Sequence, residues 1–78
     1  MTNLEKYENA FIETFGIERD TLPPLEYQAI AEWDSVGHMS LMAALEETFD
    51  IIMDTDDIID FSSFEKGKGI VKKYDVEV

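Results

Sequence analysis

Hydrophobic residues recur at helical spacing near the start of the chain. The first set consists of Leu4, Tyr7, Phe11 and Phe15. Residues with this spacing lie on one face of an α-helix, and Gly16, directly after the last of them, favours a helix end. The pattern therefore predicts an amphipathic helix from Asn3 to Phe15.

A second helical pattern predicts a helix from about Ser35 to Phe49. Its apolar stripe consists of Leu41, Leu45 and Phe49, with Met42 and Ala44 beside it. The connection between the two helices contains Pro23-Pro24, which excludes regular helix there. This long connection is also apolar, at Ile17, Leu22, Leu25, Tyr27 and Ile30. We therefore expect a loop that packs over the core.

Two shorter helices are expected in the last third of the chain. Asp54 or Thr55 would cap a brief helix, and Ser62 or Ser63 would cap the last one. The apolar residues of the two are Ile58, Ile59 and Phe61, then Phe64, Ile70, Val71 and Tyr74. Gly67 and Gly69 weaken the last helix, and glycine would allow a close approach to a neighbour. The predicted fold is all-α: a single domain over residues 1–78, a bundle of three main helices and one short helix with a long first loop.

Composition limits the chemistry of the chain. It has 78 residues and no cysteine, so disulfides and thiolate metal sites are excluded, and we expect no metal centre. No apolar run approaches the roughly 20 residues of a membrane span. We expect a cytoplasmic monomer without membrane insertion, or an organellar protein if a transit peptide has been removed.

The net charge of −12 is the strongest compositional signal. From Asp20 to Glu65 the chain contains twelve acidic residues and neither lysine nor arginine. Binding to nucleic acid or to an anionic membrane needs clustered basic groups, so neither partner is expected. The charge instead predicts partner proteins with basic patches, the alternative being an acidic surface that only keeps the protein in solution.

The pair Asp34-Ser35 stands where the long loop gives way to the second helix. A serine at a helix start has an exposed hydroxyl, and a phosphate attached to it would meet free backbone N–H groups and the positive helix end. The alternative is a simple helix cap, because Asp and Ser are common capping residues. Ten positions after the serine, the chain reads Leu45-Glu46-Glu47-Thr48-Phe49.

Together, the order of the elements, the Asp-Ser pair, the acidic second helix and the motif ten residues later resemble the acyl carrier protein family over nearly all of the chain. This resemblance implies a four-helix bundle of acyl-carrier type. It also implies that a phosphopantetheinyl transferase attaches 4′-phosphopantetheine from coenzyme A to Ser35. Acyl groups would then be held as thioesters for fatty-acid, polyketide or other specialised synthesis, and the carrier itself would catalyse nothing.

The resemblance also assigns roles to neighbouring residues. Asp34 would assist the modification of Ser35. Apolar residues beside the serine would face the acyl-loading and acyl-processing enzymes, and acidic residues would bind their basic docking patches. These positions are Val36, Met39 and Ala43, then Glu46, Glu47, Asp54, Asp56 and Asp57. For Val36 and Met39 the alternative is ordinary core packing.

The chain departs from the fatty-acid synthesis carriers at two places. These usually have acids two and five residues after the serine, where this chain has Gly37 and Ser40. The departure indicates a specialised carrier. Two further interpretations are an aminoacyl or peptidyl carrier and, in a different class, an unmodified acidic interaction module.

Two other kinds of site are disfavoured by the sequence. Asp34, Ser35 and His38 contain the residue types of a hydrolytic triad, but such a set also needs an oxyanion hole and precise geometry. We expect His38 to pack near the first helix or the loop instead. A calcium loop starting at Asp54 would have Ile58 and Ile59 where a ligand and a glycine are required.

The concentration of acidic residues generates a prediction about stability. We expect repulsion among them to destabilise the folded protein at low ionic strength, so the melting temperature should rise with added salt or millimolar magnesium. Thermal unfolding followed by circular dichroism across a salt titration measures this. A constant melting temperature would contradict the prediction.

Overall fold

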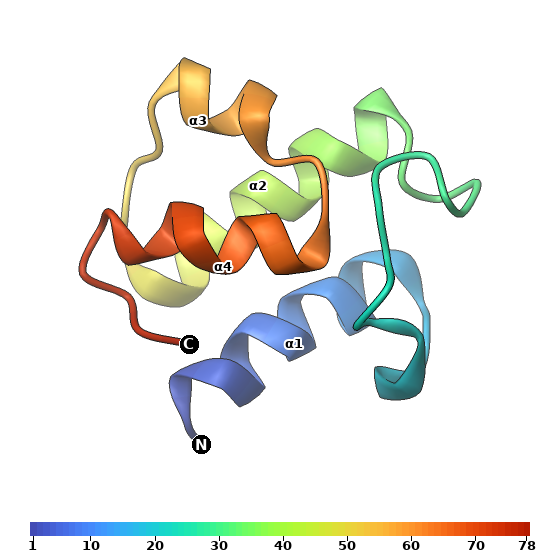
Figure 1. Cartoon of the computed structure of the whole chain (residues 1–78), viewed down its shortest axis with the longest axis horizontal. Coiled ribbons are helices and arrows are strands. Elements are labelled where there is room, and N and C mark those ends of the chain that lie inside the picture. Colours follow the sequence, from blue (N-terminus) through green and yellow to red (C-terminus); the bar gives the residue numbers. More distant parts are fainter.

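The computed structural model describes all 78 residues and contains four α-helices and no strand. They are α1 (Asn3–Phe15), α2 (Ser35–Phe49), α3 (Thr55–Asp60) and α4 (Phe64–Lys72), and a 3-10 turn, η1 (Arg19–Thr21), lies in the first loop. Figure 1 shows α4 above α1, with both chain ends on the same side of the molecule. The all-α prediction is confirmed, as are three longer helices and one short one.

Local interactions explain where α1 and α4 begin. The Thr2 hydroxyl accepts a hydrogen bond from the backbone N–H of Glu5, and the Glu5 carboxylate accepts one from the N–H of Thr2. Together these two bonds form a capping box. Ser63 caps α4 by accepting from the N–H of Lys66. Gly16 ends α1 in the left-handed conformation, as expected from the sequence.

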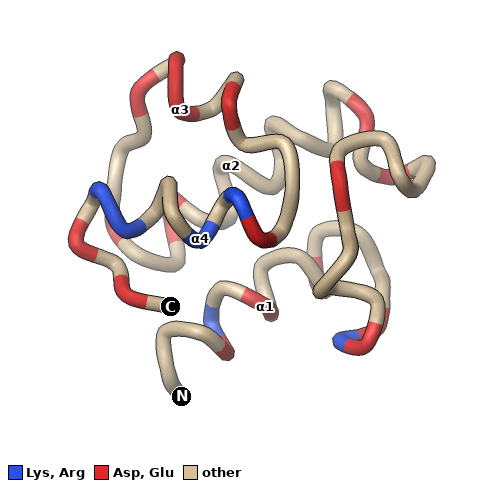
Figure 2. Tube along the Cα trace, in the orientation of Figure 1, with Lys and Arg blue, Asp and Glu red and all other residues tan.

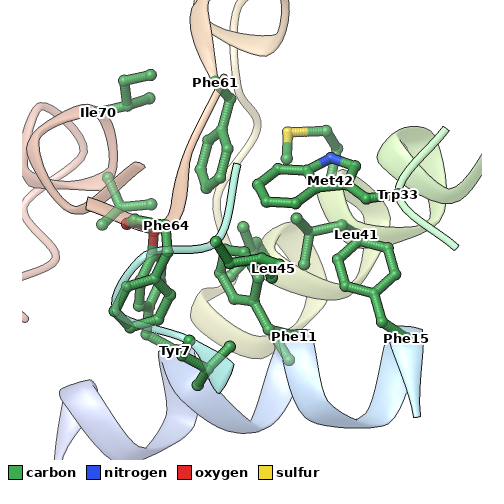
Figure 3. Packing of buried hydrophobic residues seen from close by; sticks show 14 of the residues in the cluster. Tyr7, Phe11, Phe15, Trp33, Leu41, Met42, Leu45, Phe61, Phe64 and Ile70 are labelled. Carbon is green, nitrogen blue, oxygen red and sulfur yellow. Dashed lines mark hydrogen bonds between the residues drawn. The ribbon is translucent and has the colours of Figure 1, made fainter. Parts of the chain in front are cut away.

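The core is a cluster of buried apolar side chains rich in aromatic rings (Figure 3). Phe11 of α1 lies edge-on to Trp33 and to Phe64, with ring centroids 5.6 Å and 5.2 Å away. Leu41 and Leu45 of α2 are completely buried against the same cluster. Aromatic side chains bury large areas, so these rings supply much of the stabilisation available to so short a chain.

The first loop packs over the core, as predicted. Leu22 and Leu25 are buried, and Trp33, which the sequence analysis did not assign to the core, is completely buried. An isolated antiparallel bridge between Glu26 and Ser63 fastens the loop to the start of α4. A nineteen-residue connection such as this one, from Gly16 to Asp34, remains ordered only if such contacts compensate the loss of conformational entropy.

Charge is distributed unevenly over the molecule (Figure 2). Three of the six basic residues, Lys66, Lys68 and Lys72, lie in α4 and a fourth, Lys73, follows it directly. All acidic residues except Glu65 of α4 lie in α3, in the other helices or in the loops. None of the helices combines the length and the apolar character needed to cross a membrane.

One of the two glycines in α4 is required by a close approach. A Cβ atom on Gly67 would lie 2.2 Å from the Phe61 ring and 2.2 Å from the Tyr7 hydroxyl oxygen. A Cβ on Gly69 would have no heavy atom within 4 Å. The expected close approach is therefore confirmed for Gly67, whereas Gly69 faces open space.

This difference gives a matched pair of variants. Gly67→Ala should destabilise the protein by about 1–3 kcal/mol, because the core must shift to admit the methyl group. Gly69→Ala should stabilise it by up to about 1 kcal/mol, because alanine favours the helix interior. Urea unfolding at constant salt measures both. Equal effects of the two substitutions would show that the Gly67 contact is relaxed in solution.

Candidate functional site

Ser35 is the first residue of α2 and is exposed. The residue before it, Asp34, caps the helix: its Oδ1 accepts a hydrogen bond of 2.8 Å from the N–H of Gly37. Asp34 thus supplies the side-chain cap, and the Ser35 hydroxyl is not needed for capping. The remaining N–H groups of the first turn have no intrahelical partner, so this end of α2 favours negative charge.

A surface groove of about 330 Å³ opens beside Ser35 between α2 and α3. Its lining consists of Tyr27, Ser35, His38, Met39, Ile58, Ile59, Phe61 and Ser62. The N–H of Tyr27 donates to the carbonyl of Ser62 at 2.9 Å, which joins the loop to the segment after α3. The groove therefore has apolar walls, with the exposed serine among its lining residues.

His38 connects three parts of the chain beneath this groove. Its Nδ1 accepts a hydrogen bond of 2.9 Å from Trp33 Nε1, and its Nε2 lies 2.7 Å from the carbonyl oxygen of Ile58 in α3. An indole N–H only donates and a carbonyl only accepts, so the two bonds require the tautomer with its proton on Nε2. The His38 ring lies beside that of Trp33 and nearly coplanar with it, so the prediction that it packs near the loop is confirmed.

Exposed apolar side chains surround Ser35. Val36 is 76% exposed, Met39 is 55% exposed and Ile59 of α3 is 71% exposed. Core packing, the alternative for Val36 and Met39, is therefore wrong. Ala43 is also exposed and lies on the same face of α2, because it follows Met39 by four residues. The face of α2 that carries Ser35 is consequently apolar and open to solvent.

The acidic residues expected to bind partners differ in their surroundings. Glu47, Asp54 and Asp56 are exposed. Glu46 is half-buried, and its carboxylate accepts a hydrogen bond of 2.9 Å from the N–H of Met53. Asp57 is only 8% exposed, so its carboxylate serves contacts inside the fold.

Asp57 connects α3 to the end of α4. The Tyr74 hydroxyl donates to Asp57 Oδ2, and Lys73 Nζ donates to Oδ1 at 2.9 Å. The Tyr74 hydroxyl also accepts a hydrogen bond of 2.9 Å from the N–H of Asp54. The hydrogen bond from Tyr74, followed by that from Lys73, holds the pKa of Asp57 below its usual value. This set of contacts was not predicted from the sequence, because no local pattern of residues indicates it.

A hydrolytic arrangement is absent from the serine's surroundings. Both ring nitrogens of His38 are occupied, one by Trp33 and the other by Ile58, so the histidine is not a base for Ser35. No group of three or more His, Cys, Asp or Glu side chains is arranged to hold a metal ion. The chemistry offered by this site is therefore an exposed hydroxyl beside an apolar groove.

Comparison of the chain with protein-family models, with curated proteins and with solved structures found no match. The residues around Ser35 are therefore the features that bear on function. The most informative of them are Asp34 and His38, since their hydrogen bonds define the helix start and the floor of the groove.

The Asp57 contacts generate a prediction about pH. Because the folded-state pKa of Asp57 is lowered, its ionised form stabilises the folded protein above the unfolded pKa of about 3.9. That contribution is lost as the pH falls through the folded-state pKa. The difference in unfolding free energy between wild type and Asp57→Asn should therefore be largest above about pH 3.9 and shrink on further acidification.

Asp56→Asn is the matched control, because Asp56 is exposed and lies next to Asp57 on α3. Denaturant unfolding from neutral to acidic pH measures all three proteins. A difference between wild type and Asp57→Asn that stays constant across this range would contradict the assignment.

Proposed function

We propose that the protein is an acyl carrier protein, in which Ser35 carries 4′-phosphopantetheine and the terminal thiol of that group holds acyl intermediates as thioesters. Attachment forms a phosphodiester: the Ser35 hydroxyl oxygen attacks the phosphorus of coenzyme A next to the pantetheine, loses its proton and displaces adenosine 3′,5′-bisphosphate. A phosphopantetheinyl transferase supplies the catalysis. The carrier supplies an accessible hydroxyl and a surface that the transferase recognises.

The position of Ser35 is the observation that carries this proposal. The serine is exposed, is the first residue of α2, and is not needed as the cap because Asp34 fills that role. Backbone N–H groups and the positive end of the helix favour a phosphate at this position. Because Asp34 caps the helix, the Ser35 hydroxyl is available for modification. The surroundings of Ser35 favour the attachment of a phosphate group.

The surface around Ser35 supports the same function. Val36, Met39 and Ile59 form an exposed apolar patch, which soluble proteins use for contacts with partners. Glu47 and Asp56 are exposed on the two helices that bear this patch and supply negative charge for basic docking surfaces. Methionine adapts to different shapes, which suits a carrier that visits several enzymes.

The resemblance of the helix order and of the Asp34-Ser35 pair to acyl carrier proteins adds to this argument. We further propose that the protein serves a specialised pathway, because Gly37 and Ser40 replace acids found in the fatty-acid carriers. A Cβ on Gly37 would lie 1.9 Å from the carbonyl oxygen of Glu32. An acidic side chain is thus excluded at position 37 by the close approach of the loop.

Incubation of the purified protein with coenzyme A and a broad-specificity phosphopantetheinyl transferase tests the proposal. We expect intact mass spectrometry to show the gain of one phosphopantetheinyl group in wild type and none in Ser35→Ala. Ser40→Ala is the matched control, because Ser40 is exposed on the same helix, and it should be modified like wild type.

Failure of the folded wild type to react with several transferases would contradict the carrier function. Binding of a basic partner by the unmodified protein, with no dependence on Ser35, would then favour an acidic interaction module. If modification succeeds, the mass of the thioester cargo after purification from the native host separates an acyl carrier from an aminoacyl or peptidyl carrier.

A further inference from the structure

We propose that His38 closes the interior of the bundle, so that a chain attached at position 35 stays in the surface groove between α2 and α3 and does not enter the core. His38 is in this respect a positioning residue that determines where the cargo lies. The proposal deepens the carrier function and rests on it for its biological meaning, but its test below does not need the phosphopantetheine reaction.

The first observation is that aromatic rings separate the groove from the core. His38 and Phe61 line the groove, and their rings lie edge-on to each other with centroids 6.3 Å apart. Behind them, the Trp33 ring lies beside that of His38 and nearly coplanar with it, at an interplanar angle of 14°, and the ring centroids of Phe11 and Phe61 are 6.1 Å apart. An alkyl chain at the groove would therefore meet two successive layers of aromatic rings, first His38 with Phe61 and then Trp33 with Phe11 of α1.

The second observation is that these layers are fixed by hydrogen bonds as well as by packing. His38 joins the loop to α3, because it accepts from the buried Trp33 indole and donates to the Ile58 carbonyl. Moving His38 aside would leave the Trp33 N–H buried without a partner, and unsatisfied buried groups are costly. An apolar residue at position 38 would lack these bonds and would move more easily.

The third observation concerns α3, which would have to swing outward to admit a chain. Asp57 holds this short helix to the end of α4 through Lys73 and Tyr74, while His38 holds it to α2. The core behind the groove is filled: Phe11, Trp33 and Leu45 are completely buried and line none of the hollows on the molecule. Close-packed interiors of this kind have no room for a chain unless they expand.

A single attached chain tests the proposal directly. The protein has no cysteine, so Ser35→Cys introduces the only thiol, and an octyl methanethiosulfonate reagent attaches an octyl chain to it by a disulfide. The methyl reagent gives the matched control. Isotope-filtered nuclear Overhauser spectra should show cross-peaks from the octyl methyl group to Met39 and Ile59 and none to Phe11 or Leu45.

Two variants in the same background test the role of His38. His38→Leu removes both hydrogen bonds, and the octyl chain should then give cross-peaks to Trp33 and Leu45. His38→Gln keeps an acceptor and a donor and should behave like wild type. If His38→Leu does not fold, the experiment with His38 present still decides whether the interior is closed.

Cross-peaks from the octyl chain to Phe11 or Leu45 with His38 in place would overturn the proposal. So would an octyl chain that contacts neither the groove nor the core, because the groove would then hold nothing. Neither outcome affects the attachment of phosphopantetheine to Ser35, which the mass experiment decides separately. If the octyl chain contacts only the groove and no transferase modifies Ser35, the protein has a closed core but is not a carrier.

Discussion

The packing of aromatic rings around Phe11 is the constraint on which the rest of the structure depends. Its ring contacts those of Tyr7, Phe15, Trp33, Phe61 and Phe64. These residues come from α1, from the end of the long loop, and from the segment that leads from α3 into α4. A chain of 78 residues can bury only a small core, so a single cluster must hold together elements that are distant in sequence. Gly67 is part of this constraint, because the Phe61 ring and the Tyr7 hydroxyl occupy the space that its side chain would need.

The candidate site is built outward from that cluster. Trp33 is anchored in the core, and the two residues after it emerge at the surface as the cap and the first residue of α2. One turn later His38 points back and accepts the hydrogen bond of the same tryptophan. The exposed serine therefore lies between two residues whose positions are fixed by the core. A modified serine in this place would be presented by a rigid support, although the hydroxyl itself is free.

The sequence was sufficient to predict the elements whose causes are local. The ends of α1 and α2 agree with the prediction because Thr2, Gly16 and Asp34 act on neighbouring residues. Contacts between residues distant in sequence have no such local pattern. His38 forms a hydrogen bond with Ile58, 20 residues away, and Asp57 forms one with Tyr74, 17 residues away. Asp57 looked like a surface charge because its neighbours Asp54 and Asp56 are surface charges. The groove could not be predicted either, since its walls come from separate parts of the chain.

The concentration of lysine in and directly after α4 has a consequence for how the molecule moves. Four of its six basic residues lie within positions 66–73, and only one of its 18 acidic residues, Glu65, lies in α4. The protein is therefore an electric dipole as well as an anion. In the field of a positively charged surface it experiences a torque that turns α4 away before any contact is made. Such a molecule samples fewer orientations before it binds a positively charged surface. Its orientation on arrival is selected by charge at long range, and only afterwards by shape.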